Sequence, residues 1–212
     1  MPPAIIRVDE VPAVPWRNGG GVTRELLAWP DPRDWLLRVS VADIGASGPF
    51  SAFPGIDRWF AVLSGDGVRL ETEGALPVEL TATQDALHAF RGDLATHCTT
   101  LGATTRDFNL MAQRAGLQLR QRPLGTGAQL VTNAVGAGLF VTHATEVAEG
   151  DGPGTPLPAM ALAWWPNPQR GQLRLRSASA RARGWWFEVE TGSYSTRCRN
   201  EAMAASSSMH TE

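Results

Sequence analysis

The sequence predicts an all-β protein. Runs in which apolar and polar residues alternate recur along the chain, for example at 35–42, 68–73 and 117–120. Gly, Pro and Asp residues separate these runs. Short strands with period-two alternation, divided by turn residues, are typical of antiparallel sandwiches and barrels. We therefore expect antiparallel sheets, with at most one or two helical turns at 83–92 and 107–116.

The expected strands follow one another in order. The run at 35–42 is succeeded by a strand ending near 64, and the Gly65-Asp66-Gly67 turn before the run at 68–73 indicates a hairpin. Strands are then predicted at 76–80 and 117–120. In the last part of the chain, 173–176 alternates Leu with Arg, and the run WWFEVE at 185–190 forms the final strand.

Composition and charge exclude several classes of protein. The chain has 212 residues, 43% of them hydrophobic, which suits a globular protein with its own core. A formal net charge of −2 gives no basic surplus for nucleic-acid binding. No apolar run approaches the roughly 20 residues of a membrane span. The first ten residues lack the pattern of a secretory signal, so we expect a cytoplasmic protein without nucleic-acid or membrane partners.

Familiar catalytic and cofactor motifs are absent. The triplet Gly19–Gly21 is not followed by Gly-Lys-Ser/Thr, and the sequence contains no lysine, which excludes a phosphate-binding loop and a Schiff-base lysine. His88, His97, His143 and His210 are not spaced as metal ligands. No GxSxG motif occurs, and the two cysteines, Cys98 and Cys198, are expected to be free thiols. We expect no metal, no cofactor and no catalytic residue identifiable from a motif.

Three polar clusters differ in character from the strands around them. The first is PWRNGGGVTREL at 15–26, the second is GPFSAFPGIDRWF at 48–60, and the third is RDFNLM at 106–111. Each places polar groups beside aromatic residues or glycines. By contrast, the arginines at 174, 176, 181 and 183 are interpreted as the solvent-exposed face of an alternating strand.

These three clusters, together with VLSGDGVRL and FRGD, resemble in order and spacing the HutD/Ves family over about residues 5–120. The resemblance implies a bicupin, that is, two small antiparallel β-barrels of the double-stranded β-helix type. The first would comprise residues 1–122 and the second, degenerate one residues 123–199, followed by a frayed tail at 200–212. The metal-binding histidines of ordinary cupins are missing. The family association with histidine-utilisation operons implies a regulatory or ligand-sensing role.

We expect the three clusters to meet at the open mouth of the first barrel and to form a ligand pocket. A guanidinium offers a planar fork for a carboxylate, so Arg58, if it points inward, predicts a ligand carboxylate. The alternative is a structural ion pair of Arg58 with Glu25 or Asp107. Trp16 would supply an apolar wall, and the glycines would form a barrel corner beside the pocket. The full set of predicted ligand-binding residues is Trp16, Asn18, Gly19, Gly20, Thr23, Glu25, Arg58, Arg106, Asp107 and Asn109.

Two functions remain open. The first is a metal-free binding protein that senses a small anionic metabolite of histidine degradation, such as urocanate or formylglutamate, and modulates histidine utilisation. The second is a metal-free isomerase or hydrolase in which Glu25, Asp57 or Asp107 acts as general base. The pairs Trp164-Trp165 and Trp185-Trp186 either supply one tryptophan to each face of a sheet or leave one exposed for a homodimer contact.

Overall fold

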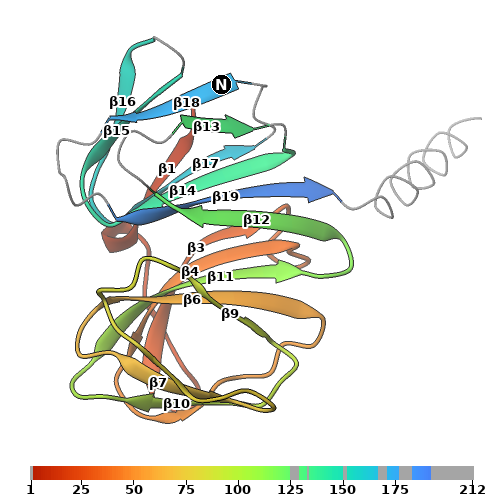
Figure 1. Cartoon of the computed structure of the whole chain (residues 1–212), viewed down its shortest axis with the longest axis vertical. Helices are drawn as coiled ribbons and strands as arrows, with labels where there is room; N and C mark the ends of the chain where they lie inside the picture. The colour runs from red at the N-terminus through yellow and green to blue at the C-terminus, as the bar shows by residue number, and fades with distance from the viewer. Residues whose placement is uncertain are drawn as a thin grey trace, which may run out of the picture.

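The computed structural model describes residues 2–124, 129–132, 134–149, 152–166, 171–176 and 183–191 (Figure 1). These residues form antiparallel strands, and no α-helix occurs among them; the one helical element is the 3-10 turn η1 (Val8–Glu10). The all-β prediction is confirmed. The helical turns expected at 83–92 and 107–116 are wrong, because these segments contain strands. No helix in the described part of the chain has the length and apolarity needed to cross a membrane.

Two sheets form the module at the bottom of Figure 1. The six-stranded sheet has the order β2 (Val14–Pro15), β3 (Gly21–Trp29), β4 (Leu37–Ile44), β11 (Thr105–Gln113), β6 (Ile56–Ser64) and β9 (His88–Arg91). The four-stranded sheet has the order β5 (Gly48–Pro49), β10 (Thr96–Thr100), β7 (Val68–Thr72) and β8 (Val78–Leu80).

Two further sheets form the module at the top of Figure 1. The five-stranded sheet has the order β1 (Ala4–Arg7), β17 (Ala161–Pro166), β14 (Gly136–Val141), β19 (Gly184–Thr191) and β12 (Leu117–Pro123). The second four-stranded sheet has the order β13 (Gln129–Thr132), β18 (Gly171–Arg176), β15 (Thr145–Glu149) and β16 (Gly154–Leu157).

Strand pairing crosses between the two halves of the sequence. β1, at the start of the chain, pairs with β17, and β12 pairs with β19, so both ends of the segment 1–122 contribute strands to the upper module. The division into a first barrel at 1–122 and a second barrel at 123–199 remains a prediction. The tail at 200–212 lies outside the described residues. The pairing implies that the two halves cannot be separated without breaking a sheet.

The central strands β4 and β11 carry an apolar residue at every second position, and these residues form the core between the two modules. Val39 and Val41 of β4 and Phe108 and Leu110 of β11 pack in one cluster with residues of the five-stranded sheet, among them Phe187. Their ring contacts include Phe108 on Trp185, with centroids 5.1 Å apart. Residues between them in sequence point the other way, into the lower module. The six-stranded sheet is therefore covered on both faces, and its second face is available for a site.

The four paired tryptophans are all buried. Trp164 and Trp185 belong to the cluster between the modules, whereas Trp165 and Trp186 belong to a separate cluster inside the upper module. Each sheet face thus receives one tryptophan of each pair, as one of the two interpretations predicted. The other interpretation, an exposed tryptophan available for a homodimer contact, is wrong because none of the four is exposed.

Two local predictions are also corrected. Gly65-Asp66-Gly67 does not close a hairpin, because β6 and β7 lie in different sheets, and the turn instead leads the chain from one sheet to the other. Arg183 is not on a solvent-exposed strand face. Its guanidinium packs 5.2 Å from the Trp185 ring and donates a hydrogen bond to the Val62 carbonyl at 2.9 Å, which joins the two modules.

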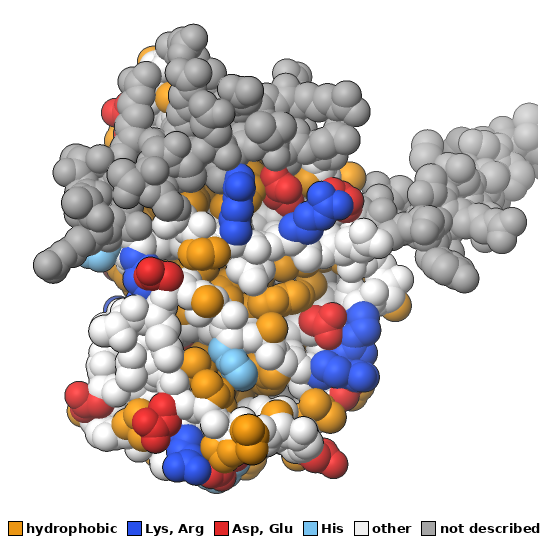
Figure 2. Space-filling view, in the orientation of Figure 1, with side chains coloured by type: hydrophobic (Ala, Val, Ile, Leu, Met, Phe, Trp, Pro, Cys, Tyr) orange, Lys and Arg blue, Asp and Glu red, His pale blue; other side chains and the backbone are white. Residues whose placement is uncertain are grey.

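Charged side chains are dispersed over the surface. On the face shown in Figure 2, the described arginines lie close to acidic side chains, and apolar side chains occupy the band between the modules. The ion pairs fit this view; for example, Arg91 lies 2.7 Å from Asp93, and Arg114 lies 2.9 Å from Asp57. This face carries no concentrated basic patch of the kind that follows a nucleic-acid backbone.

Candidate functional site

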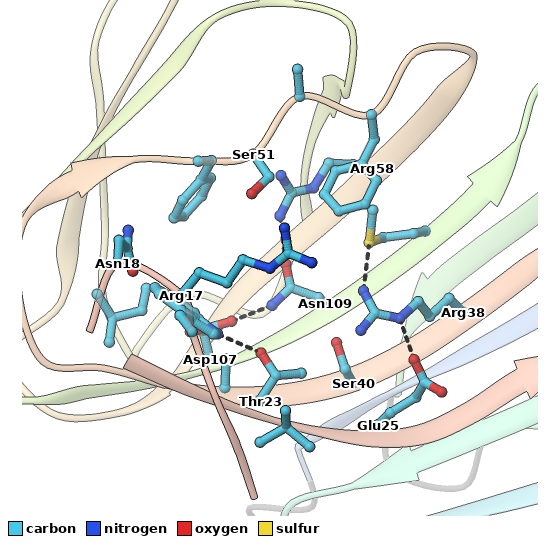
Figure 3. Close-up of a pocket in the computed structure, with 18 of the residues that line it drawn as sticks. Arg17, Asn18, Thr23, Glu25, Arg38, Ser40, Ser51, Arg58, Asp107 and Asn109 are labelled. Carbon is cyan, nitrogen blue, oxygen red and sulfur yellow. Dashed lines mark hydrogen bonds and ion pairs between the residues drawn. The ribbon is translucent and has the colours of Figure 1, made fainter. Parts of the chain in front are cut away.

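A cavity of about 930 Å³ opens into the lower module. Its polar wall is formed by side chains from β3, β4, β6 and β11, and its remaining wall by Trp35 and the segments 14–18 and 49–53 (Figure 3). This volume falls within the range of about 300–1,000 Å³ that is usual for small-molecule sites. Parts of all three polar clusters of the sequence line it.

Strand alternation explains why polar residues face this cavity. On β4, Arg38 and Ser40 line the cavity, while Val39 between them packs in the core on the opposite face. On β11, Asp107 and Asn109 line it in the same way. Antiparallel pairing then places Asn109 directly opposite Ser40, which gathers residues far apart in sequence onto one surface.

Arg58 lies on this surface as a buried cation. Its exposed fraction is 8%, and its Nη2 donates a 3.0 Å hydrogen bond to Asn109 Oδ1. Three phenylalanine rings surround the guanidinium, with centroids 4.9–5.6 Å from Cζ; they are Phe90, Phe50 and Phe53. Burial lowers the pKa of Arg58 to about 10, with Asp107 opposing the change, so the group remains charged at neutral pH.

No carboxylate of the described chain forms an ion pair with Arg58, and its Nε has no hydrogen-bond partner there. The structural alternative predicted an ion pair with Glu25 or Asp107. Glu25 instead binds Arg38 at 2.6 Å, and Asn109 lies between Arg58 and Asp107, donating to Asp107 Oδ1 through its Nδ2. A buried guanidinium that lacks direct neutralisation favours an anion from outside the chain.

Asp107 is the most deeply buried acid of the cavity wall. Its exposed fraction is 0%, and its Oδ2 has no partner among the described residues. Burial raises the pKa of this carboxyl well above its usual value, although Arg58 and Asn109 oppose the change. Burial thus favours the neutral form of this carboxyl, and the side chain of Asn109 separates it from Arg58.

The glycine-rich motif forms the turn between β2 and β3. Trp16 N donates to the Gly21 carbonyl at 2.9 Å, and Asn18 Oδ1 accepts from Gly20 N at 3.0 Å. Trp16 Nε1 donates to Thr23 Oγ1 at 2.7 Å, so this indole N–H is already engaged within the chain. The turn places Trp16, Arg17 and Asn18 on the cavity wall, consistent with a corner that also shapes a pocket.

Gly21 is the glycine of the motif that packing requires. A Cβ at this position would collide with the Asp43 carbonyl oxygen and would lie 3.0 Å from the Trp16 ring. We expect Gly21→Ala to lower the free energy of unfolding by about 1–3 kcal/mol, because β3 or Trp16 must shift. Urea denaturation measures this change.

Gly20→Ala is the matched control for that substitution. A Cβ at Gly20 meets only ordinary contacts with Asn18, and the backbone there is not left-handed. We expect a change within about 0.5 kcal/mol. Equal effects of the two substitutions would show that the close approach of Gly21 to Asp43 is not what fixes this corner.

The structure brings together seven of the ten predicted ligand-binding residues. Those that line the cavity are Trp16, Asn18, Thr23, Glu25, Arg58, Asp107 and Asn109. Three others do not line it: Gly19, Gly20 and Arg106. Arg106 instead binds Asp43 at 2.6 Å, because Asp43 alternates with the cavity-facing residues of β4 and so points to the opposite face. Arg106 and Arg24 together lower the pKa of Asp43, as expected for a carboxylate between two guanidiniums.

Several lining residues were not predicted: Arg17, Arg38, Ser40, Ser51 and Met111. A signal existed for Arg38 and Ser40, since polar residues that alternate with core valines must face either solvent or a cavity. Arg17 belongs to the first polar cluster, at 15–26, but it was not among the predicted ligand-binding residues. Asp57, a candidate general base, lies outside the cavity wall and is bound by Arg114 at 2.9 Å.

The cavity wall does not fit the divalent metal of ordinary cupins. Among the described residues that line it there is no His or Cys; of its two acids, Glu25 is held by Arg38, and Asp107 is fully buried behind Asn109. Positive side chains on the same wall would repel a cation. No cluster of three or more potential metal ligands occurs elsewhere in the described part of the chain.

The remaining titratable groups of interest lie away from the cavity. Cys98 is buried in the core of the lower module, and burial raises the pKa of its thiol to about 12, which leaves it unreactive at neutral pH. His88 stacks on Phe90 with ring centroids 5.8 Å apart, and burial lowers its pKa. Cys198 and His210 lie outside the described residues.

Comparison with known proteins identifies the family. The HutD family model matches residues 8–182, which is most of the chain. The chain belongs to the HutD family. A Pseudomonas putida relative, an uncharacterised 21.2 kDa protein encoded in the hutC 3′ region, is 41% identical over 111 residues, or 50% of this chain. The match spans 56% of that relative. Protein Ves of Cronobacter sakazakii is 34% identical over 128 residues, covering 57% of this chain and 68% of Ves.

Solved structures extend the similarity to the whole fold. PA5104 of Pseudomonas aeruginosa PAO1, a conserved protein of unknown function, has 32% identity and a TM-score of 0.80 over 89% of this chain and 98% of that one. HutD of Pseudomonas fluorescens SBW25, in a formate condition, has 26% identity and a TM-score of 0.78 over the same shares. A cupin 2 barrel protein of Leptotrichia buccalis has a TM-score of 0.57 at 9% identity, covering 91% of this chain and 98% of that one. This HutD-family protein therefore has a cupin-like β fold.

Proposed function

We propose that this HutD-family protein binds a small carboxylate metabolite of histidine degradation in the cavity and thereby modulates histidine utilisation. Urocanate and formylglutamate are the first candidates. The proposal includes a bicupin arrangement, in which the lower module is the ligand-binding barrel and the upper module is the degenerate one, whose described interior contains the tryptophan cluster.

The observation that carries the proposal is Arg58. This guanidinium is buried beside a large cavity, has an unsatisfied Nε, and has no ion pair within the described chain. Burial of an uncompensated charge is costly, and a carboxylate seated on the fork would compensate it with two parallel hydrogen bonds.

Thermal unfolding with a panel of acids tests this proposal. At 100 times its Kd a ligand stabilises by about 2.7 kcal/mol, which raises the Tm of a chain of this size by roughly 5–10 °C. We expect such a shift with urocanate or formylglutamate and none with the amide in which every carboxylate is converted to a primary amide, because that compound lacks the charge. A panel in which no acid raises the Tm more than its amide contradicts the proposal.

One observation favours the enzymatic alternative. Asp107 has a raised pKa and lines the cavity, which are properties of a general acid. Its side chain is, however, fully covered, with Asn109 between it and Arg58. NMR of the protein with each candidate metabolite separates the two functions, because only an enzyme forms product and only its activity is lost in Asp107→Asn.

A further inference from the structure

A cluster of charged side chains outside the cavity holds the turn that follows Phe53. Asp93 is its centre. The carboxylate lies 2.7 Å from Arg91 and 3.2 Å from Arg114, and it accepts a hydrogen bond from Gly55 N. These contacts, the Arg91 hydrogen bond first among them, lower the pKa of Asp93 to about 2, so this carboxylate is charged at neutral pH. The cavity wall includes none of the three charged residues of the cluster.

The segment 50–53, which ends at this turn, lies against Arg58. Phe50 and Phe53 place their ring centroids 5.0 and 5.6 Å from Arg58 Cζ. In Figure 3 the segment passes above Arg58, and Ser51 of the same segment also lines the cavity. Because the segment supplies two of the three rings around the guanidinium, its position determines how far Arg58 is exposed.

The segment is anchored at its two ends. Phe50 N donates to the Thr96 carbonyl at 2.9 Å, and Phe53 N donates to the Gly92 carbonyl at 2.7 Å. Residues 51–52 between them are exposed and form no hydrogen bond within the described part of the chain. A segment held in this way can lift from one end when the anchor at that end is released.

The second anchor depends on the charged cluster. Gly55, two residues after Phe53, has a φ of +76°, which glycine adopts without strain. Both polar groups of its backbone are held, since Gly55 N donates to Asp93 and the Gly55 carbonyl accepts from Arg114 N at 2.9 Å. Asp93 and Arg114 therefore fix the point about which the segment would turn.

We propose that the segment 50–53 is a lid over Arg58 and that Asp93 is its latch. Release of Gly55 from Asp93 allows Phe53 and Phe50 to move away from the guanidinium, which opens the cavity at Arg58. Asp93 is thus a positioning residue that acts through the lid. The inference rests on the proposed function for its purpose, which is to admit a ligand to Arg58, but it requires no particular ligand.

Modification by phenylglyoxal, a reagent for guanidinium groups, tests the latch without any ligand. Peptide mass spectrometry measures the rate at each arginine of the folded protein. In the parent we expect the buried Arg58 to react far more slowly than the exposed Arg33. Asp93→Ala should accelerate modification of Arg58 about tenfold, because the opening equilibrium loses a charge-assisted hydrogen bond, and should leave Arg33 unchanged.

Asp9→Ala is the matched control. Asp9, like Asp93, is paired with the arginine two residues before it, Arg7 at 2.8 Å, but it lies in η1, outside the lid and its anchors. This variant should not change the rate at Arg58. Arg183, largely buried between the modules, reports general loosening of the fold. The latch is overturned if Asp93→Ala accelerates Arg58 no more than Asp9→Ala does, or accelerates Arg183 equally.

The parent protein provides a second test if Asp93→Ala does not fold. Raising sodium chloride from about 0.1 M to about 1 M shortens the Debye length from about 10 Å to about 3 Å, which weakens partly exposed ion pairs such as those of Asp93. Faster modification of Arg58 alone supports the latch, and a rate that does not change with salt contradicts it. Neither test uses a carboxylate, so failure of the latch leaves the proposed function standing, and a lack of carboxylate binding leaves the latch standing.

Discussion

Replacing Arg58 with methionine is expected to abolish carboxylate binding without destabilising the fold. The buried guanidinium is the principal charge that the cavity offers, and loss of one partner of a buried charge pair costs about 2–5 kcal/mol, or roughly 30- to 5,000-fold in Kd. Methionine is similar in length and packs well among the rings of Phe50, Phe53 and Phe90. Titration calorimetry measures the loss.

Stability should respond differently from binding. The pKa of Arg58 falls from 12.5 to about 10, which corresponds to about 3 kcal/mol by which the folded state disfavours the charged form. Removing the charge relieves this cost, while Asn109 Oδ1 loses its donor at a cost of about 1–3 kcal/mol. We therefore expect the free energy of unfolding to remain equal or to rise slightly.

The two measurements together separate a binding role of Arg58 from a structural one. Arg33→Met, in an exposed position outside the cavity, serves as control and should leave both binding and stability unchanged. A large loss of stability in Arg58→Met with retained binding would mean that the guanidinium holds the barrel together and not the ligand.

Asp107→Asn is expected to stabilise the protein at neutral pH. In the unfolded chain this carboxyl titrates near 3.8, whereas burial raises its pKa in the folded state. Above pH 3.8 the folded state therefore binds more protons than the unfolded state at this site, and its contribution to stability declines as pH rises until the folded pKa is passed. Asparagine has the same shape without this titration. We expect the free energy of unfolding of Asp107→Asn to exceed that of the parent at pH 7.5.

Urea denaturation at pH 4.5, 6.0 and 7.5 tests this prediction by measuring the difference in the free energy of unfolding between variant and parent. The difference should shrink towards zero as pH falls, since both proteins are then neutral at position 107. The carboxylates with lowered pKa, such as Asp43, lose stabilisation at low pH in both proteins and so cancel. Asp34→Asn, at an exposed position, should give no difference at any pH.

The opposite pH dependence would be informative. If Asp107→Asn is less stable than the parent at pH 7.5 and the two converge on acidification, Asp107 is ionised and neutralises Arg58 through Asn109. The absence of a counter-ion for Arg58, on which the proposed function depends, would then be wrong.

Prediction from sequence succeeded for strands with one apolar face, because apolar and polar residues then alternate along the strand. Alternation at 35–42 predicted β4, and the cluster motifs predicted seven residues that line the cavity. It failed at 107–116, which was interpreted as helical, because β11 is covered on both faces. Phe108 and Leu110 face the core between the modules, and Met111 faces the cavity, so apolar residues on both faces hide the period of two.

The sequence by itself determined the all-β class, the family and the turn residues at the β2–β3 corner, because these depend on local alternation and on the motif around Gly19–Gly21. Only the tertiary structure decided which charges are balanced. Arg38 neutralises Glu25 and Arg106 neutralises Asp43, while Arg58 forms no ion pair in the described part of the chain and is separated from Asp107 by Asn109. Ion pairing and burial depend on strand register across four sheets, and spacing along one chain does not contain that information.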